Sequence, residues 1–149
     1  MPGIDKHISA AHMVLGRDLN PHDTLFAGQA ASYMIECAFL AVQAYLGTPH
    51  IVCLGLDGFR FLRPVKKGDT FTIDSAVIHT GATSVAVYIT LTRGSDGEKA
   101  AECFTTFVHI DEASGHAVPH HTPFVETSEE IKVLEAQYLA YKKAGSCKK

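Results

Sequence analysis

A long, mostly apolar stretch at residues 29–45 constrains the fold of this chain more than any other feature. At about 100° of turn per residue, such a stretch forms a helix whose apolar side chains cover most of the circumference. The remaining side carries Gln29, Ser32, Tyr33, Glu36, Leu40 and Gln43. A helix of this kind is normally enclosed by a protein core, so the rest of the chain is expected to fold around it.

Glu36 is the only ionisable acid within residues 29–45. It lies either on a narrow solvent-facing stripe or in a buried position that serves a function. A polar loop at residues 20–28, which contains Pro21 and Gly28, leads directly into the helix. This loop and helix together are the first candidate for a functional site.

The segments on both sides of the helix have the alternation and the turn residues typical of β-strands. Gly55 and Gly58 interrupt one of these segments, and glycines inside a strand indicate a bend or a close approach by another group. The last three segments are joined by tight turns, which predicts an antiparallel meander. The expected strands occupy residues 7–15, 51–62, 69–79, 85–92 and 100–110.

A second helix is expected near the C-terminus. Thr127 or Ser128 can cap it, Glu129 and Glu130 follow in the first turn, and the helix is expected to reach Lys143. The order of these elements, which is strand, helix, long antiparallel sheet and peripheral helix, predicts an α+β fold. In this fold the sheet wraps the first helix. The expected domain covers residues 4–126, with a C-terminal helix and tail at residues 127–149.

Composition narrows the class of protein. A chain of 149 residues that is 46% hydrophobic suits one globular domain. A net charge of −3 without a basic run argues against nucleic-acid binding, and no apolar run approaches the ~20 residues of a membrane span. The N-terminal residues lack the apolar centre of a signal peptide, so a cytoplasmic location is expected. The cysteines are widely spaced and are expected to be reduced thiols: Cys37, Cys53, Cys103 and Cys147.

Four motifs resemble the hotdog-fold acyl-CoA thioesterases, in that family's order over roughly residues 12 to 112. They comprise the loop from Asn20 to Gly28, the segment from Phe59 to Asp69, the turn from Gly81 to Ser84, and residues 105–111. The resemblance implies a hotdog fold, in which a long antiparallel β-sheet wraps a central α-helix. It also implies a thioester hydrolase that needs no cofactor, with coenzyme A (CoA) entering as part of the substrate.

The chain departs from the family pattern at three points. Ala27 stands where the family usually has the first glycine of a Gly-Gly pair, and Asp23 replaces a glycine of the loop. Ile35 occupies the position of the family's helix aspartate, and the acid comes one residue later, at Glu36. One residue corresponds to about 100° on a helix, although the longer glutamate side chain recovers part of that rotation.

The resemblance assigns catalytic roles to the loop and the helix. Backbone N–H groups near Gly28 and Gln29 would bind the thioester oxygen, where the helix dipole favours negative charge. Glu36 would act as general base on water or as a direct nucleophile. Asn20 would position the water or the thioester, and His22 would assist. Hotdog sites are shared between subunits, so a homodimer or a higher oligomer (tetramer or hexamer) with sites at the dimer interface is expected.

Positively charged side chains in and after the strand at residues 51–62 suit the phosphates of CoA, although they also suit a solvated turn. They are Arg60, Arg63, Lys66 and Lys67. Thr83 and Ser84 would bond the pantetheine or a phosphate, or simply close a hairpin. The acyl chain is expected beside Leu40 or Tyr33, where core packing is an equally good explanation. His116, His120 and His121 are expected in a solvated loop rather than in a metal site.

Two other functions fit the same residues. Hotdog dehydratases pair a histidine with a helix glutamate at the separation of His22 and Glu36, which favours a 3-hydroxyacyl-thioester dehydratase or hydratase as the alternative. The chain lacks the prolines and the second glycine of that motif, so hydrolysis is preferred. A non-catalytic acyl-CoA binding protein is the third possibility.

Overall fold

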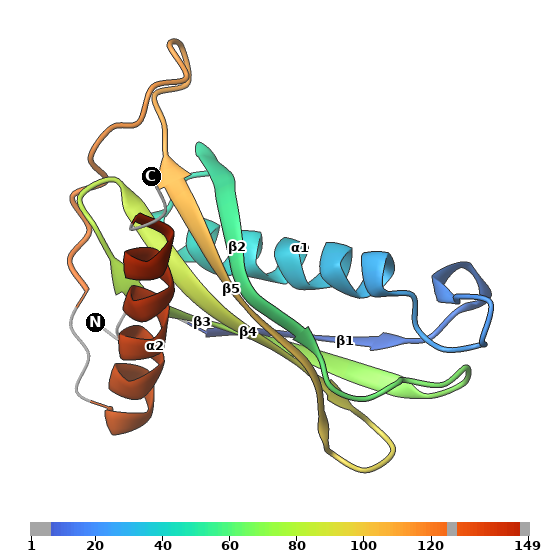
Figure 1. Cartoon of the computed structure of the whole chain (residues 1–149). Helices are drawn as coiled ribbons and strands as arrows, with labels where there is room; N and C mark the ends of the chain where they lie inside the picture. The colour runs from blue at the N-terminus through green and yellow to red at the C-terminus, as the bar shows by residue number, and fades with distance from the viewer. Residues whose placement is uncertain (1–6, 125–127, 147–149) are drawn as a thin grey trace.

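Five antiparallel strands and a long helix form most of the molecule in the computed structural model, which describes residues 7–124 and 128–146 (Figure 1). The strands lie in one sheet in the order β1-β3-β4-β5-β2. The elements are β1 (His7–Met13), the 3₁₀ turn η1 (Gly16–Asp18), α1 (Ala27–Leu46), β2 (Ile51–Phe61), β3 (Thr70–Thr80), β4 (Ser84–Arg93), β5 (Lys99–His109) and α2 (Glu129–Ser146).

This architecture confirms the expected hotdog fold. All five strands and both helices form within a few residues of the expected positions, and β3, β4 and β5 make the predicted meander. The backbone N–H of Ile131 donates to the Ser128 side chain at 3.5 Å, as expected for a helix cap. Both ends of the expected domain, together with Thr127 and Cys147, lie outside the described residues.

The sheet curves around α1, as the apolar circumference of that helix requires (Figure 1). Met34, Ala38 and Val42 are fully buried, and they belong to the face that packs on the strands. The opposing strand β3 buries every second residue, at Phe71, Ile73, Ser75 and Val77, which is the predicted alternation. α1 ends at Gly47, which adopts the left-handed conformation (φ 74°) that favours glycine.

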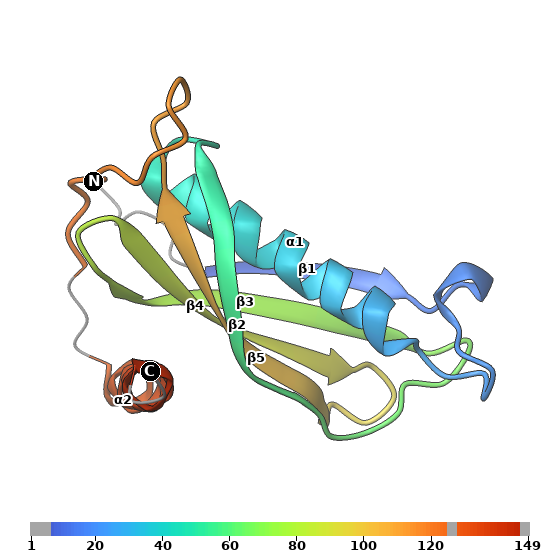
Figure 2. The ribbon, with the colours of Figure 1, turned by 45° about the horizontal axis from the view of Figure 1, so that its top comes forward.

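The second helix covers the opposite face of the sheet (Figure 2). Tyr138 of α2 is buried against Ile78 and Phe104, and its hydroxyl hydrogen-bonds Thr106 Oγ1 at 2.7 Å. His79 at the end of β3 pairs with Glu135 of α2 at 2.6 Å. α1 therefore occupies the inner face of the sheet and α2 the outer face.

The two glycines of β2 mark bends, as expected. The register against β5 shifts between Cys53 and Gly55 and again between Asp57 and Arg60. Gly58 has φ 59°, and a Cβ atom there would lie 2.7 Å from the hydroxyl oxygen of Tyr141 in α2. Glycine at this position therefore lets α2 approach the backbone of β2 closely.

Among the described residues, neither helix combines the length and the apolar character needed to cross a membrane.

Replacing Gly58 with alanine should destabilise the protein by contact with Tyr141 as well as by backbone strain. Gly97→Ala is a matched control, because Gly97 also has a positive φ (71°) but has no atom within 4 Å of an added Cβ. Gly58→Ala should lower the free energy of unfolding by about 1–3 kcal/mol more than Gly97→Ala, as measured by urea denaturation. Equal losses for the two variants would contradict the proposed close packing of α2 on β2.

Candidate active site

The loop before α1 is closed by the side chain of Asn20. Its Oδ1 accepts the backbone N–H groups of His22 (2.9 Å) and Thr24 (3.1 Å), and its Nδ2 donates to Thr24 Oγ1 at 2.8 Å. Asn20 thus has a structural role that the sequence also allows for a residue before a proline. The Nδ2 group of Asn20 carries two hydrogens. Among the described residues one of them has an acceptor, so the other can donate to a ligand.

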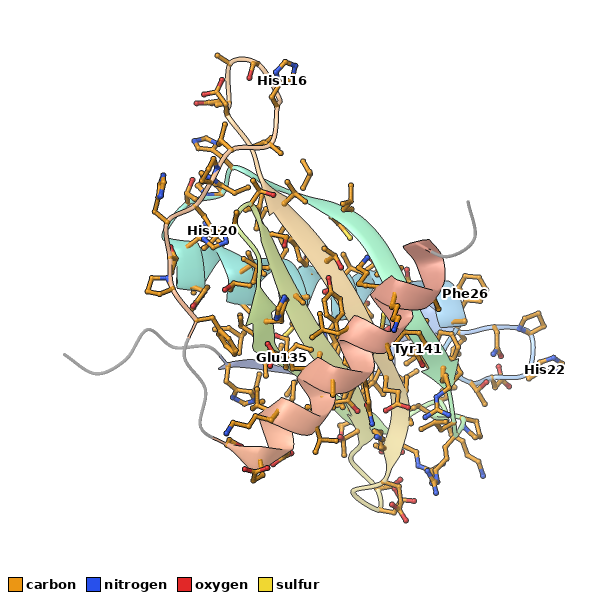
Figure 3. The ribbon with its side chains drawn as sticks, turned by 60° about the vertical axis from the view of Figure 1, so that its left-hand side comes forward. His22, Phe26, His116, His120, Glu135 and Tyr141 are labelled. Carbon is orange, nitrogen blue, oxygen red and sulfur yellow. The ribbon has the colours of Figure 1, made fainter. Side chains whose placement is uncertain are left out.

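Asp23 adopts a left-handed backbone conformation, with φ 61°. This region favours glycine, and aspartate is among the few other residues that enter it readily. The conformation explains why a glycine of the family pattern can be replaced here by aspartate. His22 next to it is exposed, and it points away from the sheet at the tip of the loop (Figure 3).

The first turn of α1 has unsatisfied backbone donors. Phe26 is the N-cap residue and supplies no side-chain hydrogen bond. Within the described residues, no acceptor is bonded to the backbone N–H groups of Ala27, Gly28 or Gln29, and the first bond of the helix runs from Ala30 N to Phe26 O at 3.0 Å. Such a helix start carries partial positive charge and suits a developing oxyanion.

The aromatic ring of Phe26 lies against Gly28. A Cβ atom at Gly28 would be 2.5 Å from this ring, so glycine makes room for Phe26 in the present structure. The Phe26 side chain is itself 51% exposed (Figure 3). In this structure the group close to Gly28 is the chain's own phenyl ring, and the binding of a substrate at Gly28 stays a prediction.

Asp18 is a buried acid that connects the loop to the helix, and it was not among the residues predicted for the site. Its Oδ1 accepts hydrogen bonds from Gln29 Nε2 (2.9 Å) and from the Tyr33 hydroxyl (2.6 Å), and its Oδ2 accepts Leu15 N–H (2.9 Å). The backbone oxygen of Asp18 accepts Phe26 N–H at 2.7 Å. Asp18 therefore positions the first two turns of α1 relative to the chain that precedes them.

The hydrogen bonds to Asp18 stabilise its charged form. Burial alone would raise the pKa of Asp18, but the donors Tyr33, Leu15 and Gln29 outweigh that effect and lower the pKa below its ordinary value. The same bond raises the pKa of Tyr33, because ionised tyrosine could not donate to the carboxylate. Gln29, predicted to bind substrate, uses its side chain for this structural contact and offers its backbone N–H to a ligand.

A pocket of about 350 Å³ opens beneath the first turn of α1. Asn20 and Arg63 are its polar lining residues. The remaining lining residues are apolar: Leu25, Ala27, Ala30, Phe61, Leu62, Pro64, Val65, Leu91, Ala100 and Ala101. The pocket thus combines apolar walls with the unpaired N–H groups of the helix start.

Three of the predicted cationic residues lie beside the loop. Lys66 is paired with Thr24 in an isolated β-bridge, and Lys67 N–H donates to Asp23 O at 3.1 Å. Arg63 lines the pocket and donates to Lys99 O at 2.9 Å. The structure therefore brings positive charge next to Asn20 and the start of α1.

Arg60 lies on the outer face of the sheet. Its guanidinium pairs with the carboxylate of Glu102, which Lys99 Nζ (2.8 Å) and the Tyr88 hydroxyl (2.7 Å) also contact. Burial alone would raise the pKa of Glu102, but the bonds from Lys99, Tyr88 and Arg60 lower it to about 2. Arg60 is thus separated by the sheet from the start of α1 in the same chain, and its role in CoA binding stays a prediction.

Glu36 is exposed on α1, on the side that the sequence predicted. It follows Gly28 by eight residues, which corresponds to about 12 Å along the helix axis. Ser32, Leu40 and Ala44 continue the exposed stripe at intervals of four residues. Within one chain, Glu36 and the helix start therefore do not converge on one small group.

Thr83 belongs to the turn from β3 to β4, and Ser84 begins β4; this turn lies near the C-terminal end of α1 (Figure 1). The loop after β5, at residues 110–124, lies against this turn, and we call this loop the strap. His109 N–H donates to Thr83 O at 2.8 Å, and a ring nitrogen of His120 lies 3.0 Å from Ser84 O. The strap continues to Pro123, whose carbonyl oxygen accepts the hydroxyl of Tyr45 in α1.

The histidines of this loop have different environments. His116 and His121 are exposed, as expected for a solvated loop, whereas His120 is partly buried in the strap (Figure 3). In the described part of the chain, no group of three His, Cys, Asp or Glu side chains is arranged to hold a metal ion.

Comparison with known proteins gives consistent matches. Residues 22–100, just over half of the chain, match the family described as the thioesterase superfamily. A protein of Bacillus subtilis (strain 168), named uncharacterized acyl-CoA thioester hydrolase YkhA, is 31% identical over 118 residues, which cover 76% of this chain and 67% of that protein.

Solved structures extend the similarity to nearly the whole chain. An acyl-CoA hydrolase from Bacillus cereus is 32% identical, with a TM-score of 0.78 and coverage of 96% of this chain and 92% of the other. A hexameric acyl-CoA thioesterase, solved in its apo form, is 29% identical, with a TM-score of 0.83 and coverage of 95% and 92%.

Asp18→Asn should destabilise the protein, because the new amide donor would face groups that are themselves donors. We expect a loss of about 1–3 kcal/mol in the free energy of unfolding near pH 7. Since folding lowers the pKa of Asp18, its contribution is complete above its ordinary pKa of about 3.9 and is lost as the pH falls through the lowered value.

The difference between wild type and Asp18→Asn should therefore narrow below about pH 4 in urea-unfolding experiments. Glu130→Gln, a change of an exposed acid in α2, is the control and should shift stability by less than about 0.5 kcal/mol. A difference that does not depend on pH would contradict the role of the ionised carboxylate.

Proposed function

Because the chain belongs to the thioesterase superfamily, we propose that it hydrolyses acyl-CoA thioesters to the free acid and CoA at the start of α1. The observation that carries this proposal is the set of unpaired N–H groups at Ala27, Gly28 and Gln29 above a largely apolar pocket. The similarity to the Bacillus cereus acyl-CoA hydrolase over most of both chains supports the same reaction. The reaction needs only water and groups of the protein, with CoA as part of the substrate.

The helix start would stabilise the oxyanion of the tetrahedral intermediate. Negative charge develops on the thioester oxygen during attack, and the N–H groups of Gly28 and Gln29 are available to bind it. The second amide hydrogen of Asn20 can orient the thioester or the attacking water at the mouth of the pocket. Asp18 keeps these groups in place through Gln29 and Phe26.

Glu36 would supply the carboxylate, from the neighbouring subunit. As general base it would take a proton from water while the hydroxide adds to the carbonyl carbon. The C–S bond would then break, and the proton would pass to the leaving CoA thiolate. Direct attack by Glu36 on the carbonyl carbon would instead break the C–S bond, release CoA and leave an anhydride, which water cleaves to the free acid and the Glu36 carboxylate. The separation of about 12 Å from Gly28 along one helix favours a site built from two chains.

An exposed apolar surface next to α1 suits such a dimer. Leu40 of α1 is 48% exposed, and Leu54 and Leu56 of β2 are 67% and 42% exposed. β2 is also an edge strand, so one of its sides is available for pairing with a second copy. We propose that two chains associate through this surface and share their active sites. The hexameric thioesterase among the related structures is consistent with further association of dimers.

Glu36→Gln should reduce the turnover of a cleavable acyl-CoA by about 10²–10⁴-fold, because the amide can neither accept the proton nor attack the carbonyl. Release of free thiol from a panel of acyl-CoAs measures this directly. Glu130→Gln, at an exposed position of α2, is the matched control and should retain wild-type turnover. Thiol release that is the same in Glu36→Gln and in wild type would disprove the assignment of Glu36.

The same panel separates the alternative functions. A dehydratase or hydratase would change the enoyl absorbance of 3-hydroxyacyl or enoyl substrates without releasing thiol. A binding protein would show tight association with acyl-CoA and neither product. Either result would replace hydrolysis as the function of this site.

Lys66 and Lys67 are proposed to bind the phosphates of CoA, together with Arg63. Changing both lysines to glutamine should raise the KM several-fold with little change in kcat, since they lie outside the reacting groups. The effect should shrink as the salt concentration rises, because exposed charges are screened. Lys143→Gln in α2 is the control. An unchanged KM at low salt would show that these lysines belong to a solvated turn only.

A further inference from the structure

We propose that the pocket beneath the first turn of α1 holds the acyl group, and that the space left by three alanines suits compact acyl groups. Ala101 lies in its floor, and Ala27 and Ala30 lie in its roof. The inference rests on the proposed thioesterase function and adds the class of substrate: short or medium aliphatic groups and single-ring aryl groups, as opposed to long fatty acyl chains.

Ala101 is a small residue in the floor of the pocket. In the register of the sheet, Ala101 of β5 lies opposite Phe61 of β2 and Leu91 of β4. Residues directly opposite each other in antiparallel strands point to the same face, and all three line the pocket. Ala101 is thus a small residue between two large ones, which leaves a depression in the inner face of the sheet.

The roof has matching small residues. Ala27 and Ala30 are three positions apart, so they share one face of α1, and both line the pocket. The next residue on that face, Met34, is fully buried in the core. The pocket therefore lies along the first turn of α1, and Met34 belongs to the packed core beyond it.

The polar groups lie where a thioester would enter. Asn20 lines the pocket and the unpaired N–H groups belong to the same first turn of α1, whereas Leu25, Val65 and Leu91 make the walls apolar. A thioester carbonyl bound to the helix start would direct its acyl group inward. Of the two positions expected for the acyl chain, Tyr33 uses its hydroxyl to bond Asp18, and Leu40 lies in the surface proposed to contact a second chain.

The size of the pocket sets the substrate class. Its volume of about 350 Å³ is near the lower end of the ~300–1,000 Å³ typical of small-molecule sites. A compact acyl group can fill this space, whereas the further methylenes of a long chain would have to leave the apolar lining or displace core side chains such as Met34. Discrimination by one methylene in such a pocket amounts to about 10–200-fold.

Two variants that fill the pocket test the inference: Ala101→Leu in the floor and Ala27→Leu in the roof. Ala27 is exposed at the first position of α1, so Ala27→Leu is the variant less liable to disturb folding. Straight-chain acyl-CoAs from acetyl to palmitoyl and benzoyl-CoA are compared by kcat/KM and by dissociation constant. Wild type should prefer a compact group over palmitoyl-CoA. Each variant should reduce kcat/KM for that preferred group at least about tenfold relative to acetyl-CoA.

Ala140→Leu is the matched control, because Ala140 lines a separate cavity on the outer face of the sheet. It should keep the wild-type preference. Unchanged preference in folded Ala101→Leu and Ala27→Leu proteins, or a wild-type preference for palmitoyl-CoA, would overturn the inference while leaving thioesterase activity intact. If binding depends on the length of the acyl group but no hydrolysis occurs, the proposed thioesterase function is overturned, and the assignment of the pocket as the acyl site is supported. Absence of both hydrolysis and binding would overturn both.

Discussion

The structure depends on one constraint, which is that a helix apolar over most of its circumference must be enclosed by a single sheet. Small residues on α1, such as Ala38 and Ala41, are fully buried and allow the strands to approach closely. A wrapped helix can be covered along its length but not at its ends, where backbone groups lack partners. The start of α1 is therefore polar for reasons of packing, and the same polarity makes it suitable for chemistry on a carbonyl group.

Much of the fold follows from local sequence patterns. The strands, both helices and the buried alternation at Phe71, Ile73 and Val77 depend on periodicity over short segments, which a single sequence contains. The face of the sheet on which Arg60 lies does not follow from local periodicity. The position of Arg60 on the outer face depends on the register shift between Asp57 and Arg60, and a shift of one residue moves a side chain to the other face.

The parts of the candidate site that belong to one contiguous motif could be predicted from the sequence. The parts that depend on tertiary contacts could not. Asn20 and Gly28 belong to one contiguous motif, and the basic turn at Lys66 lies beside it because the loop and the turn pair with each other; their catalytic and binding roles stay predictions. Asp18 could not be found in this way, since its partners Gln29 and Tyr33 are 11 and 15 residues away and become neighbours only after α1 has packed. The pocket likewise depends on small residues of two separate elements, α1 and β5, which meet only in the folded chain.

The strap formed by the loop after β5 gives the two ends of α1 different mechanical support. At the C-terminal end, Tyr45 is bonded to Pro123, and the same loop holds the turn at Thr83 and Ser84. At the N-terminal end, the Asp18 carboxylate holds Gln29 and Tyr33, and the backbone of Leu25 bonds to Val65 in the turn after β2. The two ends of the helix are thus held by different segments of the chain. A ligand at the start of α1 would therefore meet groups whose positions depend on Asp18 and on the loop before the helix, at the end of α1 that lies away from the strap.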